Sequence, residues 1–151
     1  MHHYQSILIA VDFSTPSQAA LARGVQLAGF YNASVQVVHV VDIPTYPVLE
    51  DVAVIGLAGV WDPQLTEQLT QVATQNLDKM LSNAGLDKTC GHLLMGDAST
   101  EIVSHAANIK ADLIVMGRHG VSGWQHLLGS TTNTVLNRAL CDVLTIKLDK
   151  E

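Results

Sequence analysis

Short, continuous hydrophobic runs alternate along this chain with longer segments whose apolar residues recur every three or four positions. The continuous runs are 6–11, 34–42, 89–95, 112–116 and 142–148. The segments with helical spacing cover 16–32, 63–85, 98–110 and 131–139. Continuous runs rich in branched residues are typical of strands buried on both faces, whereas spacing of three and four residues is typical of amphipathic helices.

This alternation predicts one α/β domain over residues 1–151. We expect a Rossmann-like, open parallel five-stranded sheet with helices on both faces, joined by right-handed crossovers. The common strand order 3-2-1-4-5 would place the first strand beside the fourth. The helix over 63–85 has the clearest pattern, because its apolar residues form one predicted stripe. That stripe comprises Leu65, Leu69, Val72, Ala73, Leu77, Met80 and Leu81.

One stretch, 43–61, fits neither pattern and is both long and unusually apolar for a loop. In a compact domain, a loop of this kind usually covers a ligand or meets a partner chain. We therefore expect it to lie over a binding site or at an interface.

Composition narrows the range of functions. Apolar residues make up 48% of the chain, which is typical of a globular protein. The net charge is −6, and the 8 lysines and arginines form no cluster, which argues against nucleic-acid binding. Cys90 and Cys141 are far apart in the sequence, which favours a reducing compartment. The N-terminus does not resemble a signal peptide, and no apolar run approaches the roughly 18–20 residues that cross a bilayer. We expect a cytoplasmic protein that does not contact a membrane.

A ligand site is predicted where the strand order reverses. In open parallel sheets, ligands bind outside the carboxyl ends of the strands at that point. The first strand ends near Asp12 and the fourth ends near Met116 and Gly117. If the two strands are neighbours, these residues face each other across one crevice, where Asp12 could accept a hydrogen bond from a nucleoside hydroxyl or amine.

The segment after the fourth strand suits a phosphate group. Gly117 and Gly120 would let backbone amides converge on an anion without an intervening Cβ. Gly129, Ser130 and Thr131 then begin a helix, whose first amides are unpaired and carry partial positive charge. The hydroxyl groups of Ser130 and Thr131 can also donate to phosphate oxygens.

A simpler interpretation stays open, in which the glycines form an ordinary turn and Ser130 is only an N-cap. Two standard phosphate motifs are missing from the sequence. There is no GxxxxGK(S/T) P-loop, and "VDFSTPS" follows the first strand where a dinucleotide-binding protein would carry GxGxxG.

Three stretches together resemble the universal stress protein family. "ILIAVDFS" resembles its first strand, "VVHVVD" its second, and "VMGRHGVSGWQHLLGSTTNTVL" its signature Gly-x2-Gly-x9-Gly-Ser/Thr. That signature marks the nucleotide-binding (ATP-binding) branch of the family. The resemblance extends over essentially the whole chain, strand for strand.

The resemblance implies an adenine-nucleotide site and a homodimer that pairs through the last strand, here 142–148. Its expected ligand is ATP, ADP or AMP, and a Mg²⁺ ion could be held mainly through the phosphates. Arg118, within the glycine loop, could neutralise phosphate charge or simply face solvent. The predicted nucleotide-binding residues are Ala10, Asp12, Val40, Met116, Gly117, Arg118, Gly120, Gly129, Ser130 and Thr131.

Two departures from the family pattern bear on these expectations. Only eight residues separate Gly120 from Gly129, where the signature has nine, and this leaves the choice among ATP, ADP and AMP open. Asp142 stands where the family often has a proline before its last strand, which affects the sheet edge and not the site.

Three functions remain as hypotheses. The first is a nucleotide-binding regulatory homodimer in stress response, with slow or no hydrolysis and a protein partner that the sequence does not identify. The second is a slow ATP hydrolase or nucleotide transferase, for which His119, Arg118 and His126 are the nearby candidate groups. The third is a dimeric interaction protein whose nucleotide site is vestigial. The first is the expectation carried forward, with a weak ATPase activity at most.

Overall fold

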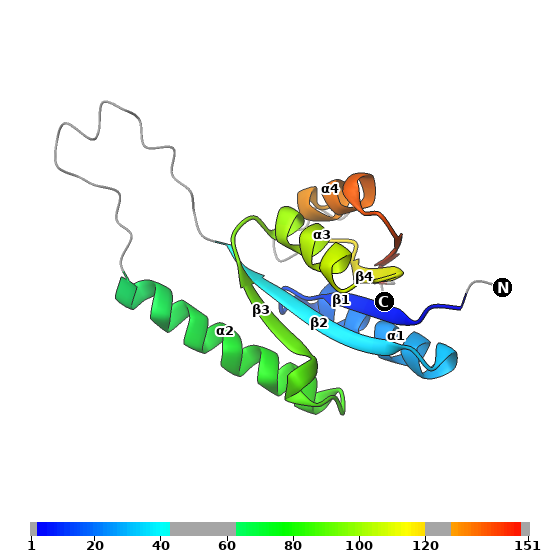
Figure 1. Cartoon of the computed structure of the whole chain (residues 1–151). Coiled ribbons are helices and arrows are strands. Elements are labelled where there is room, and N and C mark those ends of the chain that lie inside the picture. The colour runs from blue at the N-terminus through cyan, green and yellow to red at the C-terminus, as the bar shows by residue number, and fades with distance from the viewer. Residues whose placement is uncertain (1–2, 43–62, 120–127, 149–151) are drawn as a thin grey trace.

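The structure is a computed structural model that describes residues 3–42, 63–119 and 128–148. Its strands and helices alternate in the predicted order (Figure 1). The elements are β1 (Ser6–Ala10), α1 (Thr15–Tyr31), β2 (Ser34–Val41), α2 (Pro63–Asn83), the short 3-10 helix η2 (Lys88–Cys90), β3 (Gly91–Met95), α3 (Ala98–Asn108), β4 (Leu113–Gly117), α4 (Ser130–Arg138) and β5 (Asp142–Ile146).

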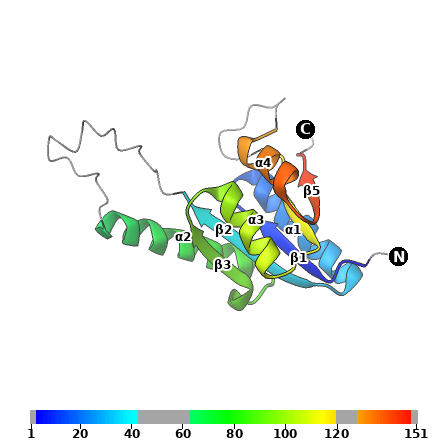
Figure 2. The ribbon, with the colours of Figure 1, turned by 45° about the horizontal axis from the view of Figure 1, so that its top comes forward.

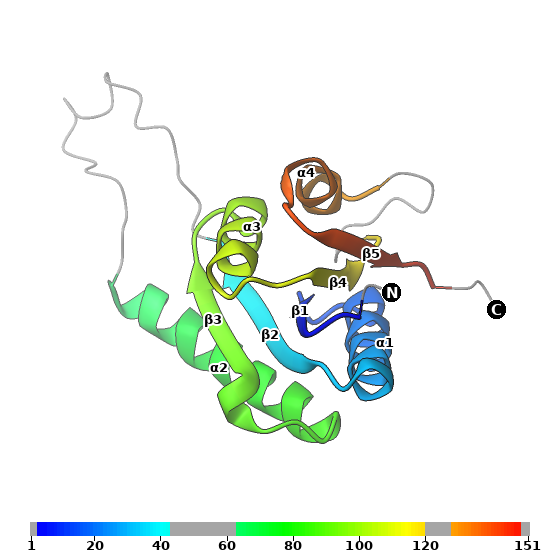
Figure 3. The ribbon, with the colours of Figure 1, turned by 45° about the vertical axis from the view of Figure 1, so that its right-hand side comes forward.

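The strands form one parallel sheet in the order β3-β2-β1-β4-β5, which confirms the predicted fold and order. Strand β1 lies at its centre, where Ile7 pairs with Val35 of β2 and Leu113 of β4. Helices α1 and α2 cover one face, and α3 and α4 cover the other (Figure 3). The order reverses between β1 and β4, so the predicted crevice exists between their carboxyl ends.

Alternate residues of β1 divide the core into two layers. Ile7 and Ile9 pack with α1 and α2, whereas Leu8 and Ala10 pack with α3 and α4. All four side chains are buried, because both faces of the central strand are covered. This two-sided burial explains why the run 6–11 is apolar at every position.

Local capping explains where two of the helices begin and end. The Ser14 hydroxyl caps α1 and accepts from the Ser17 amide at 3.3 Å, while Asn32 ends that helix in the left-handed region at φ 54°. Asp97 caps α3 by accepting from the Thr100 amide at 2.8 Å. Hydrogen bonds from Thr100 and Ser99 lower the pKa of Asp97 to about 2.

Two sequence predictions need correction. The strand expected over 89–95 begins only at Gly91, because Lys88–Cys90 form a 3-10 turn that Asp87 caps. The stripe expected on α2 is buried only in part, since Leu65, Leu69 and Val72 are 52%, 48% and 56% exposed.

The geometry of α2 accounts for the second correction. Only its later residues Ala73, Leu77 and Leu81 are buried against the sheet. The first half of the helix extends past β3, beyond the edge of the sheet (Figures 1 and 2). Segment 43–61, expected to cover a ligand or meet a partner, lies outside the described residues.

Cys90 and Cys141 are both free cysteines, and each is partly buried. None of the helices in the described ranges is long and apolar enough to span a membrane.

Candidate functional site

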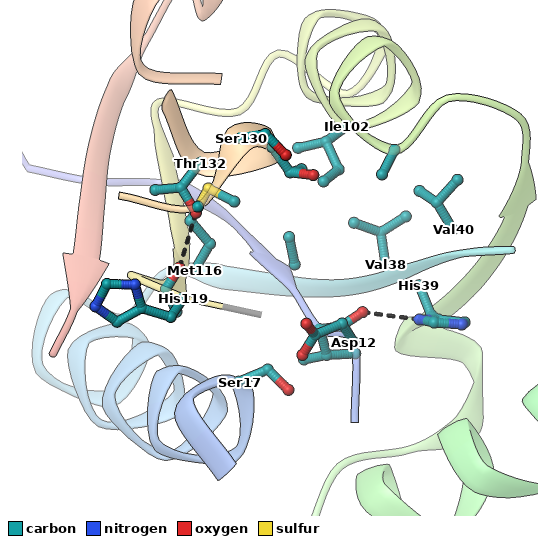
Figure 4. Close-up of a pocket in the computed structure, with 16 residues that line it drawn as sticks. Asp12, Ser17, Val38, His39, Val40, Ile102, Met116, His119, Ser130 and Thr132 are labelled. Atoms are coloured by element: carbon teal, nitrogen blue, oxygen red, sulfur yellow. Dashed lines mark hydrogen bonds between the residues drawn. The ribbon is translucent and has the colours of Figure 1, made fainter. Parts of the chain in front are cut away.

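A cleft of about 260 Å³ opens at the carboxyl ends of β1, β2 and β4, where the strand order reverses (Figure 4). The first residues of α3 and α4 complete its wall. Most of the residues predicted from the sequence line it together: Ala10, Asp12, Val40, Met116, Gly117, Gly129, Ser130 and Thr131. Arg118 does not line the cleft, and Gly120 lies outside the described residues.

The floor of the cleft is apolar. Ala10 and Met116 are register partners on the neighbouring strands β1 and β4 and are each 6% exposed. Val38 and Val40 extend this surface from β2, and Ile102 closes it from α3 (Figure 4). A surface of this kind suits a flat, weakly polar group such as a nucleobase.

Asp12 is the carboxylate of the cleft, and its surroundings fix its orientation. Its Oδ1 accepts the Ser14 amide at 3.1 Å and also the Ser14 hydroxyl, which ties it to the cap of α1. Among the described residues, no side chain or amide donates to Oδ2. The carboxylate is therefore held by one oxygen and offers the other as an acceptor to a ligand.

The chain turns sharply just after Asp12. Phe13 adopts a left-handed conformation at φ 63°, which is uncommon for a residue with a large side chain. Its ring packs on the ring of His39, with 4.2 Å between the centroids. Nδ1 of His39 lies 2.8 Å from the carbonyl oxygen of Val11, and because a carbonyl only accepts, Nδ1 donates. The ends of β1 and β2 are thereby joined.

The N-terminus of α4 enters the cleft without a side-chain cap. Gly129 is the N-cap residue, no side chain among the described residues bonds the first amides, and Ser130 is the first helical residue. The alternative in which Ser130 serves only as an N-cap is therefore wrong. Unpaired amides at a helix start favour an anion, and here they line the cleft beside Thr131.

Gly117 has a structural reason to be glycine that the sequence did not reveal. A Cβ at this position would lie 2.9 Å from Pro16 Cβ and 3.0 Å from the Pro16 carbonyl carbon. The end of β4 thus packs directly on the first turn of α1. Gly129 differs, since the nearest atom to its Cβ would be 3.6 Å away and its φ is −58°.

Two side chains after β4 have a buried nitrogen that finds no partner among the described residues. These atoms are Nε of Arg118 and Nδ1 of His119. His119 lines the cleft with the start of α4, whereas the Arg118 amide pairs with the Ile146 carbonyl at 2.8 Å beside β5. His119 is therefore a lining residue of the cleft whose Nδ1 is buried and finds no partner among the described residues. Within the described ranges, no three His, Cys, Asp or Glu residues gather as a metal site.

The sequence did not single out several residues of the wall, namely Ser17, His39, Ala98, Ile102 and Thr132. Ala98 and Ile102 carry no local signature, because their position depends on how α3 packs on the sheet. Thr132 belongs to the hydroxyl-rich run that follows Gly129, so its residue type could have indicated it. Its Oγ1 donates to the Gly117 carbonyl at 3.0 Å.

Known proteins resemble this chain along nearly its full length. A family model described as the universal stress protein family matches residues 3–147. Universal stress protein A homolog 1 of Coxiella burnetii is 32% identical over 148 residues, which cover 95% of this chain and 96% of that protein. A universal stress protein of Methanocaldococcus jannaschii is 33% identical over 153 residues, with 98% of this chain and 85% of that protein covered.

Solved structures agree on the fold. The universal stress protein UspA from Lactobacillus plantarum has a TM-score of 0.78 at 24% identity, covering 97% of this chain and 100% of that one. A universal stress protein in complex with cAMP has a TM-score of 0.62 at 23% identity, covering 97% and 98% of the two chains.

Proposed function

The chain belongs to the universal stress protein family, and we propose that it binds ATP or another adenine nucleotide in the cleft between β1 and β4. One observation carries this proposal. Asp12, with an available carboxylate oxygen, and the uncapped start of α4 line the same cleft across an apolar floor. An acceptor, an apolar surface and an anion site in that arrangement match the ribose, the base and the phosphates of a nucleotide.

Each part of the nucleotide has a complement in the cleft. The base would lie over Ala10, Val40 and Met116, and Oδ2 of Asp12 would accept from a ribose hydroxyl or an amine. The phosphates would meet the first amides of α4, where the Ser130 and Thr131 hydroxyls can donate. A Mg²⁺ ion would be held through the phosphates. That a universal stress protein of this fold was solved with cAMP, an adenine nucleotide, supports the choice of ligand class.

The proposed role is regulatory rather than catalytic. The protein would act as a cytoplasmic homodimer in stress response and would pass nucleotide occupancy on to a protein partner. Within the described residues, β5 is an edge strand with β4 as its one neighbour in the sheet, so its other side could pair with a second copy. The strand spans Asp142–Ile146, two residues shorter than the 142–148 segment expected from the sequence.

Slow hydrolysis is the second candidate, and His119 is the observation that favours it. Its buried Nδ1 has no partner among the described residues, and it lines the cleft beside the predicted phosphate position. A histidine there could orient an attacking water. Phosphate release by the purified protein that falls with His119→Ala would support this activity. Release that is unchanged in His119→Ala and Ser130→Ala would rule out this site as its source.

The nucleotide itself can be tested without assuming any activity. Freshly purified protein is denatured, and any released nucleotide is identified by chromatography and mass spectrometry. Adenine nucleotide approaching one per chain is the expected result. Empty protein that also fails to bind added ATP by calorimetry would overturn the proposal and favour a vestigial site.

A pair of variants ties the binding to the cleft. Asp12→Asn keeps the size of the side chain but removes its charge and an acceptor, so we expect ATP affinity to fall about tenfold, the scale of a hydrogen bond to a charged group. Asp78→Asn, on α2 and away from the cleft, is the matched control and should bind like the wild type. Equal affinities in the two variants would place the ligand elsewhere.

A further inference from the structure

The other face of the sheet contains a second cavity, larger than the cleft. It holds about 630 Å³ between α1 and α2, two helices that cover the same face of the sheet (Figure 3). We name it the α1/α2 groove and define it by apolar walls and a polar rim. The walls include Phe13, Leu21, Val25 and Met80, and the rim comprises Gln18, Asn76, Lys79 and Asn83.

The walls of the α1/α2 groove belong to the hydrophobic core. Leu21 is 4% exposed within the core on this face, and Phe13, Val25 and Met80 pack against that core while remaining partly exposed. The outer surfaces of these side chains face the groove and do not pack against one another. Apolar atoms without neighbours lose dispersion contacts, so an apolar occupant of this volume would be favoured. The volume lies within the range of about 300–1,000 Å³ typical of small-molecule sites.

The rim has a distinct charge character. Among the described residues that line the groove, Lys79 is the one charged residue, and none is a carboxylate. In the described part of the chain Lys79 makes no salt bridge, while the nearby Lys88 pairs with Asp78 at 2.8 Å. The other rim groups are amides, which can donate hydrogen bonds. This local combination favours a ligand with an anionic head, although the chain as a whole carries a net charge of −6.

We propose that the α1/α2 groove is a second ligand site that binds a small amphipathic carboxylate, of the kind that a medium-chain fatty acid represents. The apolar body would fill the space between Phe13, Val25 and Met80. The carboxylate would lie at the rim, paired with Lys79 and the neighbouring amides. This binding does not depend on the nucleotide function proposed for the cleft.

Phe13 connects the groove to the cleft. It lines the groove, packs on His39 and directly follows Asp12, which lines the cleft. Its left-handed backbone at φ 63° is held by this packing, so a ligand that shifts the ring acts on the turn that orients the Asp12 carboxylate. Occupancy of the groove should therefore change nucleotide affinity, and nucleotide should change affinity at the groove by the same factor. Only this coupling rests on the proposed nucleotide function.

The test uses the full chain and two fluorescent probes with the same ring system. Anilinonaphthalene sulfonate is anionic, and N-phenylnaphthylamine is its neutral counterpart. We expect both to bind at one saturable site and to be displaced by dodecanoate. Lys79→Gln should lower the affinity for the anionic probe about three- to fivefold, the scale of a partly exposed ion pair. The affinity for the neutral probe should not change. Lys110→Gln, an exposed lysine at the end of α3, is the matched control.

A second variant fills the site. Ala22 lines the groove, and Ala22→Trp should abolish binding of both probes while α1 remains folded by circular dichroism. Probe binding that survives Ala22→Trp, or that responds equally to both lysine variants, would overturn the proposal. So would conversion of an oligomer to a monomer by Ala22→Trp, because a second copy would then be the occupant.

A measurement on the wild type keeps the test decisive if Ala22→Trp fails to fold. Dodecanoate should shift the backbone amide resonances of Phe13, Val25 and Met80 in a two-dimensional NMR spectrum. Shifts confined to other parts of the protein would overturn the proposal. If dodecanoate binds in the groove but ATP does not bind at all, the nucleotide function fails and the second site stands.

Discussion

The hydroxyl of Thr132, in the first turn of α4, donates a 3.0 Å hydrogen bond to the carbonyl oxygen of Gly117, the last residue of β4. Thr132 is 3% exposed, so water does not compete effectively for this bond. Both residues line the cleft. The bond therefore fixes the start of α4, where an anion would bind, against the end of the strand that carries the cleft floor.

Thr132→Val should reveal what this attachment contributes. The substitution keeps the shape of the side chain but leaves the Gly117 carbonyl without its partner, which should cost about 1–2 kcal/mol of unfolding free energy. ATP affinity should fall as well, because the start of α4 is no longer held. Thr134→Val is the control, since its hydroxyl bonds only within the helix, to Ser130 O. Urea unfolding and calorimetry measure the two effects, and equal losses in both variants would contradict this interpretation.

The two glycines of the site should respond differently to alanine. At Gly117 the added Cβ would meet Pro16 at 2.9 Å, so Gly117→Ala should destabilise the free protein by about 1–3 kcal/mol. At Gly129 the nearest atom is 3.6 Å away and the backbone suits any residue, so Gly129→Ala should change stability by less than about 1 kcal/mol.

The same pair separates folding from ligand binding. Gly129→Ala should still weaken ATP binding, because its methyl group adjoins the first amides of α4. Thermal unfolding of the free protein and calorimetry with ATP measure the two properties independently. A Gly129→Ala protein with normal stability and normal affinity would show that the phosphates do not approach this residue.

The two halves of α2 should differ in their contribution to stability. Leu77 is 4% exposed in the core, so Leu77→Ala should cost about 2–5 kcal/mol. Leu69 is 48% exposed, so Leu69→Ala should change the unfolding free energy by no more than about 0.5 kcal/mol. The contrast is measured by denaturant unfolding. A large loss in Leu69→Ala would mean that this face of α2 is covered in solution, by a second copy or by another part of the chain.

General rules made the site partly predictable from the sequence. The positions of Asp12 and Gly117 follow from parallel strands, whose carboxyl ends meet at one edge of the sheet, and from the common strand order. Both residues directly follow apolar runs that were recognisable without a structure. Ser130 and Thr131 were found because hydroxyl residues after glycine at a helix start are typical of anion sites.

Features that depend on packing could not be predicted. The periodicity of α2 shows which residues share a face but not how far that face extends past the sheet, so Leu69 and Leu77 looked equivalent. Ile102 reaches the cleft only because of the position of α3. His92 is half-buried in β3, where its ring centroid lies 4.8 Å from that of His105. Such a pair joins residues from separate elements, and no local pattern marks it.

The partly buried His105 should make the protein less stable in mild acid. Burial, and to a smaller extent the nearby His92, lower the pKa of His105 below its ordinary value of 6.5. The unfolded chain therefore binds a proton at a higher pH than the folded protein does, so unfolding takes up protons in this range. Stability should be fully present above pH 6.5 and should fall as the pH drops below it, towards the lower pKa of the folded state.

Two variants test this dependence. His105→Gln removes the titrating group and can still reach the side chain of Gln36, which His105 contacts at 3.2 Å, so the loss between pH 7 and pH 5 should shrink. His92→Gln removes only the smaller cause of the lowered pKa of His105. It should therefore reduce the loss of stability on acidification by less than His105→Gln does. Melting temperatures at matched ionic strength measure the effect. If wild type and His105→Gln lose the same stability on acidification, the pH dependence arises from other groups.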